Sequence, residues 1–101
     1  MTKENIIASA RIFAKLQTVL EKDNGTDVIN AARKPVKMMV IYNKEALARR
    51  VLNEETQRYL CEEYDKFTLE EFEAGLEESL SLPDQGVWQL AYDRAKQEFR
   101  K

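Results

Sequence analysis

Six basic side chains between residues 33 and 50 are the groups in this chain most able to do chemistry. They are Arg33, Lys34, Lys37, Lys44, Arg49 and Arg50. Glu45 is the only acid in this stretch, and Tyr42 is interleaved with the cations. Such a cluster beside an aromatic ring is typical of surfaces that contact nucleic-acid phosphates without reading bases. The alternative is that these side chains only keep a buried helix soluble.

The distribution of charge along the chain is compatible with a basic surface on a mildly acidic protein. Residues 1–50 hold ten Lys or Arg and five Asp or Glu, a net charge of +5. Residues 51–101 hold six and thirteen, a net charge of −7. Attraction to a polyanion depends on where charges lie rather than on the overall −2. A second basic set, Arg11, Lys15 and Lys22, shares one face of the first expected helix and serves either phosphate binding or ordinary solvation.

Residues suited to catalysis or to transition-metal binding are scarce. The chain has no histidine and a single cysteine, Cys61, which excludes a structural zinc site and a Cys/His nucleophile. It has no EF-hand spacing and no glycine-rich phosphate loop. The paired carboxylates Glu70/Glu71 and Glu77/Glu78 could do acid–base chemistry, but solvated helix faces rich in Glu are far commoner. We therefore predict that the chain is not an enzyme and uses no cofactor or metal.

Length and composition predict a single all-α domain over residues 1–101, a compact bundle of five to six helices. The chain is 44% hydrophobic and 34% charged, with only three Gly and two Pro, which suits helices joined by short loops. A lone cysteine is typical of a reducing, cytoplasmic setting. No window approaches the roughly 18 apolar residues of a membrane span, and the N-terminus lacks a signal-peptide core. No membrane partner is expected.

Apolar periodicity predicts six helices. They run from about Lys3 to Lys22, from a Thr26–Asp27 cap to Ala32, from Val36 to about Leu52, from Glu54 to Lys66, from the Thr68–Glu71 capping box to Leu80, and from Ser81 to the C-terminal end. The run Val36–Tyr42 could alternatively be a buried strand, but nothing else in the chain offers it a partner strand. Helix is therefore favoured there.

Residues that stop or cap helices define the expected boundaries. Asn24–Gly25 is expected to end the first helix in the left-handed conformation. Asn53 should cap the fourth helix, a capping box at Thr68–Glu71 the fifth, and Ser81 the last. Gly86 lies one turn into the last helix, where it costs helix stability. This predicts that another group packs against the backbone at Gly86.

Three segments stand in order along the chain, namely Arg11–Leu16, Ala32–Lys37 and Ser81–Tyr92. Together they resemble the C-terminal helical domain of the type I-C CRISPR large subunit, which is also made separately as the small subunit of the surveillance complex called Cascade. That family has a Gly-Arg-Leu-Phe-Ala helix, a Ser/Thr-Pro before an apolar helix, and a Leu-Ser-Leu-Glu-Glu-Gln-Gly-Leu-Phe-x-Leu-Gly-Tyr segment. Ser81–Tyr92 is the sharpest match, with Pro83–Asp84 in place of Glu-Glu and Ala91 in place of the second Gly. The family's His-rich stretches have no counterpart here.

The resemblance implies an all-helical, non-catalytic small subunit of a CRISPR RNA-guided surveillance complex. Such subunits pack on the backbone and large subunits and on other copies of themselves, with guide RNA nearby. They contact the target or displaced DNA strand and stabilise the R-loop, whereas guide pairing reads the sequence. On this chain we predict that the six cations from Arg33 to Arg50, supported by Arg11 and Lys15, are the phosphate contacts.

A second hypothesis is a small helical interaction protein with no nucleic-acid role, such as a phage or mobile-element inhibitor or assembly factor. Residues 54–78 carry ten acids against Arg58 and Lys66. This acidic stretch would then bind a basic partner, as a mimic of DNA. A helix-turn-helix regulator is less favoured because the chain lacks a tight turn between two short helices.

Overall fold

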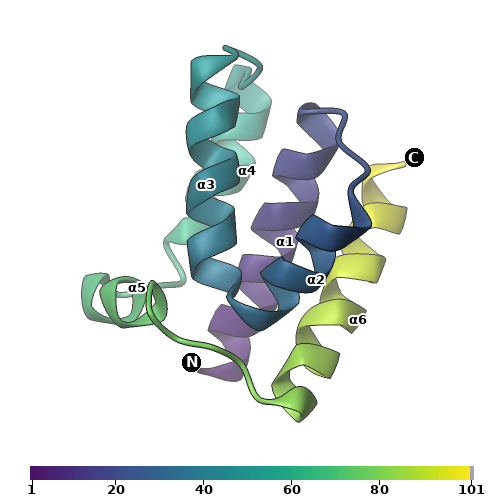
Figure 1. Cartoon of the computed structure of the whole chain (residues 1–101). Coiled ribbons are helices and arrows are strands. Elements are labelled where there is room, and N and C mark those ends of the chain that lie inside the picture. Colours follow the sequence, from purple (N-terminus) through teal and green to yellow (C-terminus); the bar gives the residue numbers. More distant parts are fainter. Residues whose placement is uncertain (101) are drawn as a thin grey trace.

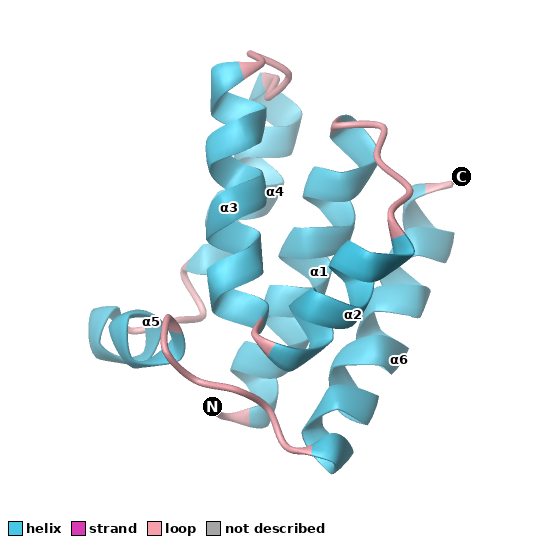
Figure 2. Ribbon diagram, in the orientation of Figure 1, coloured by secondary structure: helices cyan, strands magenta, loops and turns pink. Residues whose placement is uncertain are grey.

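The first helix, α1 (Lys3–Val19), is central, and four of the other helices contact it (Figure 1). The computed structural model describes residues 1–100, which form six helices and no strand (Figure 2). The other five are α2 (Gly25–Arg33), α3 (Pro35–Ala48), α4 (Glu54–Tyr64), α5 (Leu69–Gly75) and α6 (Leu82–Phe99). The predicted all-α bundle of five to six helices is confirmed. Within residues 1–100, no helix combines the length and apolarity needed to cross a bilayer.

The side chains of α1 are buried on most sides because α3, α4 and α6 all pack against it. Ile6, Ala10, Phe13 and Gln17, which follow the helical period, are each at most 2% exposed. Leu20, just past the end of the helix, is 1% exposed. The periodicity of this segment therefore correctly identifies the face that enters the core.

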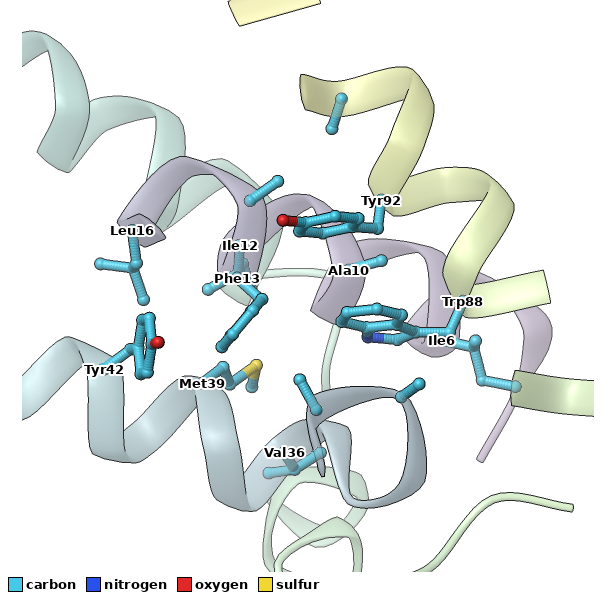
Figure 3. Close-up of a cluster of buried hydrophobic side chains, with 14 of the residues drawn as sticks. Ile6, Ala10, Ile12, Phe13, Leu16, Val36, Met39, Tyr42, Trp88 and Tyr92 are labelled. Atoms are coloured by element: carbon cyan, nitrogen blue, oxygen red, sulfur yellow. The ribbon is translucent and has the colours of Figure 1, made fainter. Parts of the chain in front are cut away.

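Four aromatic rings from three helices form the centre of the core (Figure 3). The Phe13 ring of α1 has its centroid 4.5 Å from that of Tyr42, 5.8 Å from Trp88 and 6.1 Å from Tyr92. Trp88 and Tyr92, one turn apart on α6, stack with centroids 5.1 Å apart and planes 9° apart. These tilted and stacked geometries are the favourable ones for aromatic pairs. Phe13 thus joins α1 to both α3 and α6.

Hydrogen bonds from two tyrosines of this cluster fix the packing of neighbouring helices. The Tyr92 hydroxyl donates to Gln17 Oε1 inside the core and joins α6 to α1. The Tyr42 hydroxyl donates to the Asp27 carboxylate and joins α3 to α2. Since a buried hydroxyl without a partner is costly, each bond favours one register between its two helices.

The expected N-terminal caps of three helices are confirmed. In the box that begins α5, the Glu71 N–H donates to Thr68 Oγ1 (3.0 Å) and the Thr68 N–H donates to Glu71 Oε1 (2.8 Å). Asn53 Oδ1 accepts from the Thr56 N–H (2.8 Å) at the start of α4. Ser81 caps α6. Each cap satisfies backbone donors that have no partner within the helix.

The expected boundary between α1 and α2 is wrong. The helix α1 ends at Val19, and Glu21 takes the left-handed conformation (φ 54°) in which a Gly was expected. Asn24 does not end α1. Its side chain accepts hydrogen bonds from the backbone N–H groups of Thr26 and Asp27 at the start of α2. Asn24 is the N-cap of α2, and Thr26–Asp27 lies inside that helix.

Two other helices end earlier than the apolar pattern predicts. The helix α3 ends at Ala48 rather than near Leu52, and Arg50 follows with φ 56°. The helix α5 ends at Gly75, and Leu80 lies in the loop beyond it, where its N–H donates to the Arg33 carbonyl (2.8 Å). In both places an apolar side chain reaches the core from a loop, which a helical period cannot distinguish from a longer helix.

The expectation that the backbone at Gly86 is closely packed is also wrong. A Cβ built on Gly86 would have no atom within 4 Å. The close approach occurs instead at Gly75, where a Cβ would lie 2.6 Å from Val36 Cγ2. Gly75 therefore lies where α5 approaches α3 closely.

Candidate nucleic-acid interface

The junction between α2 and α3 brings three cations together at the N-terminus of α3. Lys34 is both the C-cap of α2 and the N-cap of α3, and its backbone has φ −131° and ψ 73°. Pro35 at the first helical position disfavours a helical conformation for the residue before it, so the chain turns at Lys34. Arg33, Lys34 and Lys37 are all exposed and line a shallow groove of about 310 Å³ with Asn30 and Met38.

The N-terminus of α3 adds a partial positive charge to this groove. No side chain caps the helix, so its first backbone N–H groups lack the partner that a cap would supply. The macrodipole of a helix favours anions at this end, and phosphates often bind there. The sequence signal for this feature was the absence of Ser, Thr, Asp or Asn directly before Pro35.

Lys44 continues the basic surface along α3. Lys37, Ile41 and Lys44 are spaced by four and three residues, so they share one face of the helix, and all three are exposed. At 1.5 Å per residue, Lys34 and Lys44 are about 15 Å apart along the helix. That length spans several charges of a DNA duplex, which carries one about every 1.7 Å.

We call Arg33, Lys34, Lys37 and Lys44 the α2–α3 basic surface. Among residues 1–100, none of these four side chains forms an ion pair. Their charges are therefore available to a phosphate without breaking an intramolecular contact. Such contacts position nucleic acid without reading its sequence.

The side chains of Arg11 and Lys15 make contacts with other helices of the molecule. The Arg11 guanidinium pairs with Glu63 of α4 (Nε to Oε2, 3.5 Å) and with Glu98 of α6 (Nη1 to Oε2, 3.5 Å). The Lys15 Nζ lies 4.6 Å from the centre of the Phe99 ring. These contacts hold α1 to α4 and α6, and binding a phosphate would compete with them.

Lys22 and Arg49 also make contacts within the molecule, near the C-terminal end of α1. Lys22 Nζ lies 2.7 Å from Glu45 Oε1 and 5.0 Å from the centre of the Tyr42 ring. Arg49 Nη1 lies 3.4 Å from Glu45 Oε2 and donates to the Leu20 carbonyl (3.3 Å). Lys22 lies beyond the end of α1, so it does not share a helix face with Arg11 and Lys15. Arg50 is exposed but lies past the end of α3.

The Glu45 carboxylate should make stability depend on acid pH. The hydrogen bond from Lys22 holds the pKa of Glu45 below its ordinary value of 4.5. A carboxyl whose pKa is lowered by folding contributes stability above its unfolded pKa and loses it as pH falls through the folded pKa. The difference in Tm between wild type and Glu45→Gln, measured by circular dichroism, should therefore be largest near neutrality and shrink below pH 4.5. A difference that stays constant down to strongly acid pH would contradict this assignment.

Two of the paired carboxylates in and after α5, Glu71 and Glu78, make contacts within the protein. Glu71 is held by the capping box, and the hydrogen bond from the Thr68 backbone lowers its pKa. It is therefore ionised near neutral pH and cannot act as an acid there. Within residues 1–100, no three Asp, Glu or Cys side chains are grouped as a metal site would require. Glu70 and Glu77 are exposed, Glu71 belongs to the capping box, and Glu78 pairs with the N-terminal ammonium of Met1.

The comparisons with known proteins identify no relative of this chain. No family model matches the sequence, and no curated protein and no solved structure is detectably similar to it. The resemblance to the type I-C small subunit therefore stays a prediction from the three segments of sequence.

Proposed function

We propose that the chain is a non-catalytic helical subunit that holds DNA by sequence-independent phosphate contacts on the α2–α3 basic surface. The observation that carries the proposal is that Arg33, Lys34 and Lys37 lie together at the uncapped N-terminus of α3, and that Lys44 continues this surface along the helix. None of the four forms an ion pair among residues 1–100. Arg11 and Lys22, which lie outside this surface, are instead paired with acids of other helices. Binding through this surface requires no rearrangement of the core.

The setting that we propose rests on the resemblance to the type I-C small subunit, which Ser81–Tyr92 and two other segments carry. In that setting the chain packs on the CRISPR backbone and large subunits, and on other copies of itself, in the cytoplasm. The α2–α3 basic surface then steadies the target or displaced strand of the R-loop. Guide RNA supplies the sequence specificity through base pairing.

Removing three cations of this surface should weaken DNA binding more than removing three elsewhere. We expect Lys34→Ala/Lys37→Ala/Lys44→Ala to lower the affinity for a fluorescent duplex by roughly tenfold or more at moderate salt, because three phosphate contacts are lost. Fluorescence anisotropy with the purified chain measures this directly. All three side chains are exposed, so folding should be unchanged by circular dichroism.

A matched control removes the same amount of charge from other exposed positions. Arg58, Arg94 and Arg100 are exposed on α4 and near the end of α6. The variant Arg58→Ala/Arg94→Ala/Arg100→Ala has the same net charge as the first variant. It should bind the duplex within about threefold of wild type, since it loses only long-range attraction. Equal losses in the two variants would overturn the assignment of the α2–α3 basic surface.

The acidic interaction protein is the second candidate, and one surface feature favours it. Leu69 at the start of α5 is 73% exposed and is followed by Glu70 and Glu73, which are exposed and form no ion pair among residues 1–100. A basic partner could use such a surface. Absence of any DNA binding by wild type, together with binding of a basic partner that Glu70→Lys/Glu73→Lys abolishes, would support this candidate.

A further inference from the structure

A groove between α1 and α6 is lined by seven side chains that the proposed DNA surface does not use. These two helices lie side by side (Figure 1). The groove has a volume of about 370 Å³. Its lining residues are Lys3, Ile7 and Arg11 of α1 with Val87, Leu90, Ala91 and Arg94 of α6.

The floor of the groove is apolar and open to solvent. Leu90 is 53% exposed and Ile7 is 38% exposed, and both belong to the small set of large hydrophobic side chains left uncovered in residues 1–100. Val87 and Ala91 are half-buried beside them. Single exposed apolar residues are ordinary, but their gathering in one groove marks a site for an apolar partner surface.

The rim of the groove is basic. Lys3, Arg11 and Arg94 lie along it, and no acidic residue lines it. Among residues 1–100, Lys3 and Arg94 form no ion pair. The pairing of Arg11 with Glu63 and Glu98 holds that side chain at the edge of the groove. A ligand that complements the groove therefore carries carboxylates beside apolar groups.

We infer that this groove docks an acidic amphipathic helix from a partner protein. A helix laid along α1 and α6 would place apolar side chains at i, i+3 or i+4, and i+7 on Ile7, Val87 and Leu90, as in other helix-in-groove complexes. Its flanking Glu or Asp side chains would meet Lys3 and Arg94 at the rim. Charge complementarity of this kind sets the orientation and the choice of partner. A nucleic-acid strand would leave the apolar floor uncovered, so the groove fits a protein helix better.

The inference goes beyond the proposed DNA binding and can fail separately from it. The groove and the α2–α3 basic surface share no residue. They also lie on different helices, α1 and α6 in one case and α2 and α3 in the other. A change in one surface should therefore leave binding at the other unaltered.

The test uses two synthetic helical peptides that differ only in charge. Each has Leu at i, i+3, i+4 and i+7, with Glu at the flanking positions in one and Lys in the other. Addition of the Glu peptide should shift the methyl NMR signals of Ile7, Val87 and Leu90, with an affinity at least about tenfold higher than that of the Lys peptide. Equal affinities, or shifts confined to other parts of the protein, would overturn the inference.

A matched pair of variants decides whether the groove itself is the site. Leu90→Asp should reduce the affinity for the Glu peptide by about tenfold or more. Leu47 on α3 is 58% exposed, close to the 53% of Leu90, so Leu47→Asp is a control and should bind the peptide like wild type. Equal effects of the two substitutions would contradict the inference. If the same groove methyls shift on addition of duplex DNA, or on self-association of the protein alone, the inference is wrong. The occupant of the groove is then DNA or a second copy of the chain.

Discussion

Phe13→Ala should cost about 3–5 kcal/mol of folding free energy, the largest loss expected from any single substitution considered for this chain. Phe13 is fully buried, and its ring contacts those of Tyr42, Trp88 and Tyr92. Removing the ring leaves a cavity that joins α1, α3 and α6, and the stacked pair on α6 can fill it only in part. Since small domains have a total stability of about 5–15 kcal/mol, a variant with a much lower urea midpoint is expected.

The control for this prediction is a large apolar side chain that contributes little to the core. Ile29 on α2 is 63% exposed, and Ile29→Ala should change stability by no more than about 0.5 kcal/mol. Urea unfolding followed by circular dichroism measures both variants. A Phe13→Ala loss below about 1 kcal/mol would mean that this residue is not at the centre of the core.

Gly75→Ala should destabilise the protein by about 1–3 kcal/mol, although alanine is the better helix former. The added Cβ would lie 2.6 Å from Val36 Cγ2 and 3.3 Å from Val36 Cβ. Val36 is fully buried in α3, and as a β-branched residue in a helix it has one strongly preferred rotamer. The neighbour therefore cannot move aside, and α5 must shift away from α3.

Gly86→Ala is the matched control for Gly75→Ala, and it should have the opposite sign. No atom lies within 4 Å of a Cβ at Gly86, so alanine there should stabilise α6 by roughly 0.5–1 kcal/mol through helix propensity alone. The double variant Val36→Ala/Gly75→Ala isolates the contact, because Val36→Ala removes the obstructing methyl groups. Gly75→Ala should then cost much less than it does in wild type. An equal cost in both backgrounds would show that the Val36 contact is not the cause.

Local polar signals predicted where α4, α5 and α6 begin, because a cap depends on residues only three positions apart. A Thr followed three residues later by Glu, as at Thr68 and Glu71, is the local pattern of a capping box. Asn53 and Ser81 also cap through residues close in sequence. The ends of helices were predicted less well. Glu21 and Arg50 both take positive φ, and neither is of a residue type that signals a left-handed stop.

The sequence shows that the cations of the candidate site are clustered, but it does not show which of them make contacts within the protein. All of Arg33, Lys34, Lys37, Lys44 and Arg49 are basic residues within a short stretch. Arg49 is occupied because the Leu20 carbonyl and the Glu45 carboxylate lie beside it, and the Leu20 contact spans 29 positions. The same holds for Arg11, whose partners are Glu63 and Glu98. Contacts over such separations depend on tertiary packing and leave no mark on the local sequence pattern.

The salt dependence of duplex binding tests the central claim most directly. If four cations of the α2–α3 basic surface each neutralise one phosphate, log K should fall against log salt with a slope of about −3.6. In Lys34→Ala/Lys37→Ala/Lys44→Ala the slope should rise to about −1, since only the contact of Arg33 is left. The control Arg58→Ala/Arg94→Ala/Arg100→Ala should keep the wild-type slope. A slope that is the same in all three proteins would contradict the account.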